Sequence, residues 1–181
     1  MKQFLNISGD RTAASIDAMP PVAEFRDAMR HLASGVSLVT TKGLDGRRQG
    51  MLATAVSSVT ADPPTILVCV NRSATMHNGL IESQNFCVNF LSHRHLELSR
   101  RFSSSEARES RFDGNDWTTL STGAPVLGGA LSAIDCELES AVEVGSHSVL
   151  FGRIVEIRAA SCSDEKPLIY YDRQYGEFVG V

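Results

Sequence analysis

The sequence has no long apolar run, no basic block and no continuous apolar stretch near its start. Its longest strongly apolar segment, residues 66–70, is far shorter than the roughly 20 residues that a membrane helix requires. Residues 1–21 mix polar side chains with isolated apolar ones, whereas a signal peptide needs a continuous apolar core. Lys and Arg number 17 against 21 Asp and Glu, so the net charge is −4 and no cluster could follow a phosphate backbone. We therefore expect no membrane segment, no export and no binding to nucleic acid.

Cysteines are few and far apart. The four thiols, Cys69, Cys87, Cys136 and Cys162, match neither a CxxC zinc site nor the density of a secreted disulfide scaffold. We interpret them as buried thiols in a reducing cytoplasm. His93 and His95 are the other candidate metal ligands, but two residues that are two apart on a helix point about 200° away from each other. The sequence therefore predicts no metal site.

The common nucleotide and nucleophile motifs are also missing. No GxGxxG follows a strand and no GxxxxGK[ST] occurs, so neither a Rossmann nor a P-loop site is indicated. The serines at 103–105 have no nucleophile elbow around them. Taken alone, Ser57 and Ser58 fit a plain strand edge, and His147 in a Gly-Ser-His turn fits a surface residue.

The composition is that of one folded domain. The chain has 181 residues, of which 43% are hydrophobic and 21% charged, which is enough to bury a core and far from the pattern of a disordered chain. Residues 1–20 are polar and aperiodic, so we expect a flexible N-terminal arm there and a single domain over 21–181.

Hydrophobic periodicity predicts more strands than helices. Apolar steps of three and four predict an amphipathic helix over 22–34, a helix over 74–83 capped by Ser73 or Thr75, and helical stretches at 96–102 and 106–112. Extended segments are predicted at 36–41, 49–60, 65–70, 86–91, 133–144, 149–158 and 167–171. Residues 145–147 read as the turn of a long antiparallel hairpin, and 173–176 as a closing segment. Six or seven strands joined by short turns indicate a mainly β, antiparallel barrel with peripheral helices.

Several short segments, read in order, resemble one known family. They are Phe25-Arg26-Asp27-Ala28-Met29, Gly35-Val36, Gly50-Met51, Ala53 to Ser58, Asp62-Pro63-Pro64, Val70-Asn71-Arg72-Ser73, Phe86 to Leu91, Arg101-Phe102, Arg111-Phe112, Trp117, Gly123 to Leu127, Cys136, Gly145-Ser146-His147 and Pro167 to Tyr171. Their order and approximate spacing resemble those of the short-chain flavin reductases over residues 22–178. The chain differs from the family at Leu52, commonly Thr or Ser, at Val56, commonly Phe, and at Ser146, usually Asp.

The resemblance implies a fold and an activity. Such proteins have an FMN-binding split barrel, are typically homodimers with the flavin near the subunit interface, and reduce FMN or FAD with NADH or NADPH for a partner flavin-dependent monooxygenase. The protein has to hold the two nucleotides so that a hydride can pass between them, which requires no covalent nucleophile. Two alternatives remain: a split-barrel flavoprotein that holds FMN for electron transfer without turnover, and an interaction domain with an empty barrel.

The resemblance also implies which residues form the site. A reducible flavin needs phosphate donors, an apolar slot and backbone N–H groups at its pyrimidine edge. The expected flavin-binding residues are Gly50, Met51, Leu52, Ala53, Thr54, Ala55, Ser57, Ser58, Cys69, Val70, Asn71, Arg72, Ser73, Thr75, Met76, Arg101 and Phe102. The expected nicotinamide-side residues are His147, also the catalytic candidate, Tyr170, Tyr171 and Arg173. A helix end with a surface Arg and a core Phe is the alternative for Arg101 and Phe102.

Overall fold

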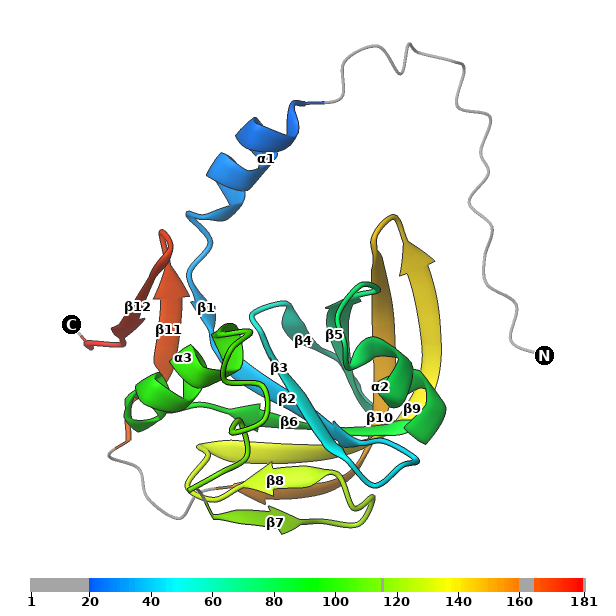
Figure 1. The fold of residues 1–181 in the computed structure, drawn as a ribbon. Coiled ribbons are helices and arrows are strands. Elements are labelled where there is room, and N and C mark those ends of the chain that lie inside the picture. The colour runs from blue at the N-terminus through cyan, green and yellow to red at the C-terminus, as the bar shows by residue number, and fades with distance from the viewer. Residues whose placement is uncertain (1–19, 115, 160–164, 181) are drawn as a thin grey trace, which may run out of the picture.

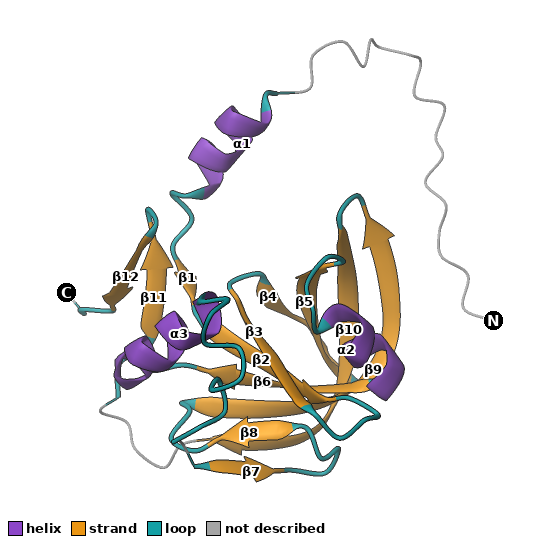
Figure 2. Cartoon of the chain, viewed as in Figure 1, coloured by secondary structure: helices purple, strands orange, loops and turns teal. Residues whose placement is uncertain are grey.

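A computed structural model describes residues 20–114, 116–159 and 165–180, and its main element is one antiparallel sheet. The sheet has seven strands in the order β3-β2-β6-β9-β10-β5-β4 (Figures 1 and 2). Their bounds are β2 Ser37–Lys42, β3 Arg48–Ala53, β4 Val56–Ala61, β5 Pro64–Asn71, β6 Asn85–Phe90, β9 Ser132–Val144 and β10 His147–Ala159. The predicted N-terminal arm and Cys162 lie outside the described residues, apart from Pro20.

The two ends of this sheet come together because its edge strands follow each other in sequence. Only Thr54 and Ala55 separate β3 from β4, and β3 also contacts β5. Strand alternation then directs one face inward, where Val39, Val68 and Phe86 are fully buried in a single cluster. The result is the mainly β, antiparallel split barrel that the sequence predicts.

Smaller elements cover the ends of the barrel. β1 (Ser34–Gly35), β11 (Leu168–Tyr171) and β12 (Gln174–Glu177) form a three-stranded sheet, and β7 (Trp117–Thr119) pairs with β8 (Pro125–Leu127). The helices are α1 (Val22–Met29), α2 (His77–Ser83), the short η1 (His93–His95) and α3 (Leu96–Ser103). A second apolar cluster, which includes Leu38, Leu98 and Phe102, joins α3 to the barrel. Within the described residues, no helix combines the length and apolarity needed to cross a membrane.

Three helix predictions are wrong in part. α1 ends at Met29 instead of continuing to residue 34, because Ser34 and Gly35 pair with β11. α2 begins at His77, and neither Ser73 nor Thr75 caps it, since Met76 occupies the cap position without a side-chain hydrogen bond. Residues 106–112 form turns and no helix. The predicted helix at 96–102 is confirmed as α3.

The strand predictions are confirmed, with local corrections. The extended segment 49–60 is two strands, β3 and β4, separated by Thr54 and Ala55. The long hairpin turns at Gly145 and Ser146 only, because His147 already pairs with Val144. The closing segment at 173–176 belongs mostly to β12, which completes a hairpin with β11.

The α1 helix projects away from the barrel (Figure 1) and buries no residue. The apolar face predicted for it is therefore uncovered in the single chain. Val22 is 65% exposed, Phe25 58%, Met29 46% and Leu32, just beyond the helix, 60%. An apolar face of this kind on a folded chain indicates an interaction surface.

Candidate functional site

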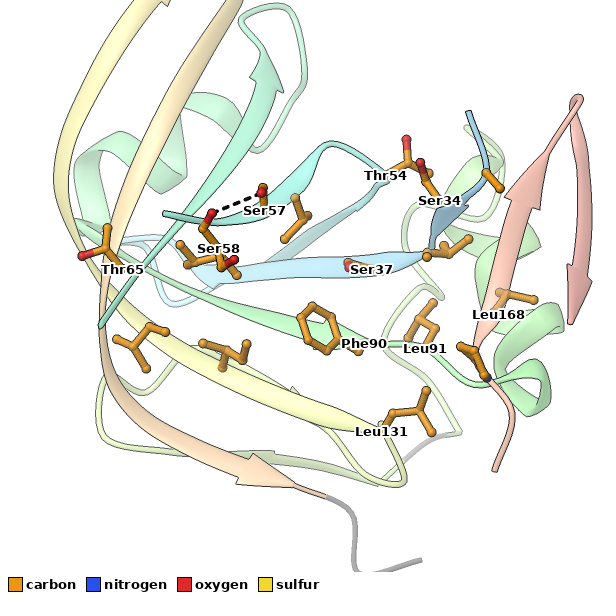
Figure 3. A pocket seen from close by; sticks show the side chains of 18 of the residues that line it. Ser34, Ser37, Thr54, Ser57, Ser58, Thr65, Phe90, Leu91, Leu131 and Leu168 are labelled. Carbon is orange, nitrogen blue, oxygen red and sulfur yellow. Dashed lines mark hydrogen bonds between the residues drawn. The ribbon is translucent and has the colours of Figure 1, made fainter. Parts of the chain in front are cut away.

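A cavity with a volume of about 710 Å³ lies beside β4 (Figure 3). Hydroxyl-bearing side chains, among them Thr54, Ser57 and Ser58, line one side of it, and Phe90, Leu91 and Leu131 line the other. The volume is typical of a small-molecule site, where an apolar wall faces a few polar groups. Three of the predicted flavin-binding residues thus share one cavity with a large apolar wall.

The segment 50–58 connects this cavity to a second pocket. Gly50, at its start, lines a pocket of about 670 Å³ on the side of α2, whereas Thr54, Val56, Ser57 and Ser58 line the first cavity. β3 pairs only with β2, and β4 only with β5, so each leaves an edge of backbone groups that no other described strand pairs. Unpaired backbone N–H groups are the donors that a flavin pyrimidine edge requires.

Sequence-distant residues meet where β5 ends and β10 begins. Asn71 lies opposite His147 in the ladder, and the Arg72 amide donates a hydrogen bond to the Ser146 carbonyl at 2.9 Å. His147 is exposed, and its Nδ1 lies 2.9 Å from the Ser146 hydroxyl. The structure therefore brings together Asn71, Arg72 and Ser73, which we expected at the flavin, and His147, which we expected on the nicotinamide side.

The phosphate donors predicted at this place are already occupied. The Arg72 guanidinium forms an ion pair with Glu143 on β9. The Ser73 hydroxyl and amide donate to the Asn71 side-chain oxygen, at 2.8 and 2.9 Å, which makes a local Asx turn. The guanidinium and the hydroxyl that we expected to hold a phosphate therefore each have a protein partner.

Some of the other expected flavin-binding residues between 69 and 76 belong to the hydrophobic core. Val70 is fully buried and Met76 is 2% exposed, both in the barrel cluster, while Cys69 is half-buried. Burial raises the pKa of the Cys136 thiol to about 12 and raises that of Cys87 as well, so neither thiol is a nucleophile near neutral pH. Thr75, by contrast, is exposed and lines the 670 Å³ pocket.

Arg101 and Phe102 hold the end of α3. The Arg101 guanidinium donates to the carbonyls of Asp113, at 2.6 Å, and Ser110, at 3.4 Å. Phe102 is 4% exposed and packs edge-on against Phe112, with ring centroids 5.3 Å apart. This is the helix-end arrangement that we considered as the alternative, and it leaves Arg101 as an anchor of the loop after α3.

The predicted tyrosines lie elsewhere in the chain's fold. Tyr170 packs against Tyr175 at 5.3 Å between centroids, and Tyr171 lies 6.2 Å from the His31 ring. Arg173 has a left-handed backbone with φ of 64° and lines a hollow beside α1. Figure 1 places β11 and β12 on the opposite side of the barrel from the β9–β10 tip. A single chain does not bring these residues to His147.

Several candidate functional residues escaped the prediction from sequence. Arg48, Arg108 and Arg111 line the 670 Å³ pocket together with Thr75, although 60 residues of sequence separate the first two. His77, which opens α2, has its Nε2 2.9 Å from the Ser148 hydroxyl, next to His147. The motif Arg111-Phe112 was a usable signal for the pocket, whereas Arg48 and Arg108 carry none in the sequence alone.

Metal-ligating residues do not gather in the described part of the chain. Nδ1 of His95 lies 3.1 Å from the Ser92 amide nitrogen and 3.1 Å from the Ser92 hydroxyl oxygen, which forms a capping box. Burial lowers the pKa of His95. His93 lies 3.4 Å from the Lys166 carbonyl, so both histidines belong to the local packing of η1.

Comparison with known proteins identifies a family and similar sequences. A family model described as "Flavin reductase like domain" matches residues 29–178. The chain is 44% identical over 169 residues to the FMN reductase (NADH) RutF of Pseudomonas syringae pv. syringae, covering 91% of this chain and 93% of the relative.

Solved structures agree in fold over nearly the whole chain. BorF, the flavin reductase component of a bacterial two-component tryptophan halogenase, superposes with a TM-score of 0.78 at 30% identity, over 88% of this chain and 99% of BorF. The styrene monooxygenase flavin reductase of Pseudomonas putida S12 also gives 0.78, at 26% identity, over 87% of this chain and 99% of the other.

Proposed function

Because the chain belongs to the flavin reductase-like family, we propose that it is an NADH-dependent FMN reductase that supplies reduced flavin to a partner monooxygenase. NADH and FMN are the pair named for the Pseudomonas syringae relative, and they are the substrates we assign in preference to NADPH and FAD. The reaction is NADH + H⁺ + FMN → NAD⁺ + FMNH₂, with a hydride passing from the nicotinamide to the flavin. The cysteine pattern suggests the cytoplasm as its compartment.

The observation that carries this proposal is the position of residues 50–58. This one segment borders an apolar cavity with a hydroxyl wall and a pocket rich in arginine, and it belongs to strands whose outer edges are unpaired. A flavin needs an apolar surface for its ring, backbone donors for its pyrimidine and cations for its phosphate.

We assign roles within the flavin site accordingly. The backbone of residues 50–55 donates to the pyrimidine edge, where negative charge collects on reduction. Met51 and Leu52 are half-buried and supply apolar contact, and Ser57 and Ser58 on β4 are exposed and line the 710 Å³ cavity. These groups bind and orient the flavin, and the flavin itself supplies the redox chemistry.

His147 and Asn71 are the residues we assign to the nicotinamide nucleotide. Both lie at the open end of β5 and β10, and the Nε2 atom of His147 remains available when its Nδ1 contacts Ser146. A histidine can hydrogen-bond a carboxamide or a ribose hydroxyl, and no covalent nucleophile is needed for hydride transfer.

We further propose that the functional unit is a homodimer. The uncovered apolar face of α1 supports it, as do Tyr170, Tyr171 and Arg173, which a single chain separates from His147. A two-fold interface uses the same surface of both subunits, so one apolar helix face on each chain is enough to contribute to it.

The test is an NADH oxidation assay with purified protein and each combination of FMN or FAD with NADH or NADPH. We expect a colourless protein that oxidises NADH only when free flavin is added, with FMN and NADH the best pair. A rate no higher than the protein-free blank for all four combinations would refute the activity. A stably yellow protein without turnover would instead support the electron-transfer alternative.

A further inference from the structure

His77, the first residue of α2, links this helix to the start of β10, which lies beside it (Figure 1). Its Nε2 atom is 2.9 Å from the Ser148 hydroxyl, and the Ser148 side chain has no other hydrogen bond among the residues that the structure describes. Ser148 is 2% exposed, so water cannot replace a lost partner unless the surrounding chain moves. The buried hydroxyl therefore depends on the His77 ring.

The bond holds β10 from inside the barrel. Ser148 lies opposite Val70 in the β5–β10 ladder, and Val70 is fully buried in the barrel cluster. Because the side chains of a strand alternate between its two faces, Ser148 points inward with Val70, whereas the exposed His147 points outward. His77 thus fixes the backbone next to His147 from the opposite face of the sheet.

The helix that carries His77 is firmly packed. Leu80, on the first turn of α2, is fully buried, and Met76, just before the helix, is 2% exposed. Both belong to the barrel cluster, and the Leu80 amide donates to the Met76 carbonyl at 2.9 Å. Side chains packed in a dense core leave a helix little freedom to shift. The half-buried His77 ring is therefore a fixed anchor for β10.

The other links between this part of the chain and the tip of the β9–β10 hairpin lie at the surface. Residues 143–147 are exposed. The ion pair of Arg72 with Glu143 joins two exposed side chains, and pairs of this kind contribute little. A backbone hydrogen bond from the Arg72 amide to the Ser146 carbonyl adds to the ladder. The contact between His77 and Ser148 is the buried side-chain link at this end of β10.

We propose that His77 is a positioning residue for hydride transfer: its hydrogen bond to Ser148 keeps His147 in place beside Asn71. The inference rests on the proposed function, which assigns His147 and Asn71 to the nicotinamide nucleotide. Without His77, Ser148 would be a buried hydroxyl without a partner, which favours movement of the strand until water reaches it. In a site that orients two reactants, a displacement of about 1 Å can lower the rate about a hundredfold, so a small movement of β10 has a measurable effect.

The first test breaks the bond from each side. His77→Ala removes the imidazole and Ser148→Ala the hydroxyl, whereas His77→Gln retains a side-chain N–H that can donate to Ser148. We expect kcat/KM for NADH to fall at least about threefold in both alanine variants, and His77→Gln to recover most of the loss. The dissociation constant for FMN, from flavin fluorescence, should stay within about twofold, because the flavin is assigned to residues 50–58.

The second test determines whether His77 acts through His147. His77→Ala, His147→Ala and the double variant form a cycle in kcat/KM for NADH. If His77 serves to place His147, its removal has no further effect once residue 147 is alanine, so the double variant matches His147→Ala within about twofold. A residue that only supports the fold would give losses that multiply.

The chain contains a matched control. His95 is also a half-buried histidine whose ring nitrogen contacts a buried serine hydroxyl, that of Ser92, at 3.1 Å, but it lies in η1 and outside the β5–β10 ladder. His95→Ala should lower Tm and leave kcat/KM for NADH unchanged at a temperature where circular dichroism shows every variant folded. If His77→Ala does not fold, Ser148→Ala, which removes a single oxygen atom, replaces it in the cycle.

Two results would overturn the assignment. One is wild-type kinetics in both His77→Ala and Ser148→Ala, and the other is a double variant whose loss is the product of the two single losses. The same cycle is measured on the dissociation constant for NADH by nucleotide fluorescence, which needs no turnover. A wild-type protein that binds NADH but does not reduce FMN would refute the proposed function, and the binding cycle would still decide whether His77 positions His147.

Discussion

His147 and Asn71 lie opposite each other at the point where β10 begins and β5 ends, and this pairing is why we propose His147 for the nicotinamide site. If His147 hydrogen-bonds NADH, the change His147→Ala removes one bond at a partly desolvated place. We expect a loss of about 1–2 kcal/mol, which is roughly five- to thirtyfold in kcat/KM for NADH, with the FMN dissociation constant unchanged.

Steady-state kinetics and a flavin titration on this variant provide the measurement. His93→Ala is the control, because His93 is an exposed histidine on η1 whose nearest polar partner is the Lys166 carbonyl. A loss confined to flavin binding, or no loss at all, removes His147 from the nicotinamide site.

Asp135 makes the stability of the protein depend on pH. It is fully buried, accepts hydrogen bonds from the Thr122 amide and hydroxyl at 2.8 and 2.6 Å, and burial raises its pKa above the value of 3.8 expected in an unfolded chain. Between these two values the folded state holds a proton that the unfolded state has released. The free energy of unfolding therefore falls as pH rises from about 4 through the raised pKa.

The variant Asp135→Asn isolates this contribution, because its side chain does not ionise. Its one amide oxygen can accept from the Thr122 amide, and its NH₂ group can donate to the Thr122 hydroxyl oxygen. Urea unfolding of both proteins between about pH 4 and pH 8 gives the difference in the free energy of unfolding. We expect the wild-type protein to lose stability relative to the variant as pH rises. A difference that stays constant over the whole range contradicts the prediction.

At the scale of the elements, Gly50 determines how closely α3 approaches β3. A Cβ atom on Gly50 would lie 2.7 Å from Cε1 of Phe102, 3.3 Å from the Val39 carbonyl oxygen and 3.4 Å from Cζ of Phe112. Overpacking of this kind costs about 1–3 kcal/mol, so we expect Gly50→Ala to lower Tm by several degrees.

Gly35→Ala is the comparison, because a Cβ atom there meets nothing within 4 Å. Its Tm should stay within about one or two degrees of the wild type, since exposed substitutions change stability by about 0.5 kcal/mol at most. Equal melting temperatures for both variants would show that α3 moves aside without cost.

The strands were the elements that sequence predicted best, and local chemistry explains why. β5, β6, β9 and β10 each carry a run of apolar and β-branched residues bounded by turn residues, and the structure confirms all four. The wrong predictions of secondary structure occur where contacts with residues far away in the sequence determine the local conformation. Ser34 and Gly35 leave the helical pattern because Tyr170 and Ile169 pair with them, and the loop around residue 110 is fixed by Arg101.

Some residues of the candidate site could also be selected from the sequence, and others could not. Asn71 and His147 were each selected from the family's motifs, and the structure adds that the two lie opposite each other in the β5–β10 ladder. Arg48, at the start of β3, and Arg108, in a turn, could not be expected, because exposed arginines normally point into solvent. Their convergence depends on how Phe102 and Phe112 pack between α3 and β3, which no short stretch of sequence encodes.

For the molecule as a whole, α1 is the helix whose apolar face stays exposed in a single chain. If its apolar face joins two copies, Phe25→Glu places a charge where Phe25 is now 58% exposed and should weaken the dimer by at least about tenfold. Sedimentation at micromolar concentration measures the change.

Ala23→Glu is the matched change, because Ala23 lies on the opposite face of the same exposed helix. We expect it to leave the oligomeric state as it is in the wild type. A wild-type protein that sediments as a monomer, or two variants that behave alike, would contradict a dimer built on this face.

The strand order also has a consequence for synthesis on the ribosome. β5 and β6 emerge early, but their missing partners in the sheet are β10 and β9, which emerge much later. Until then a nascent chain can form only the three strands β3-β2-β6 and the hairpin β4–β5, and the remaining open edges of β5 and β6 are templates for pairing with other chains. A chain that stalls before residue 132 would thus be a substrate for chaperones or for aggregation, and translation of the β9–β10 hairpin is the event that ends this exposure.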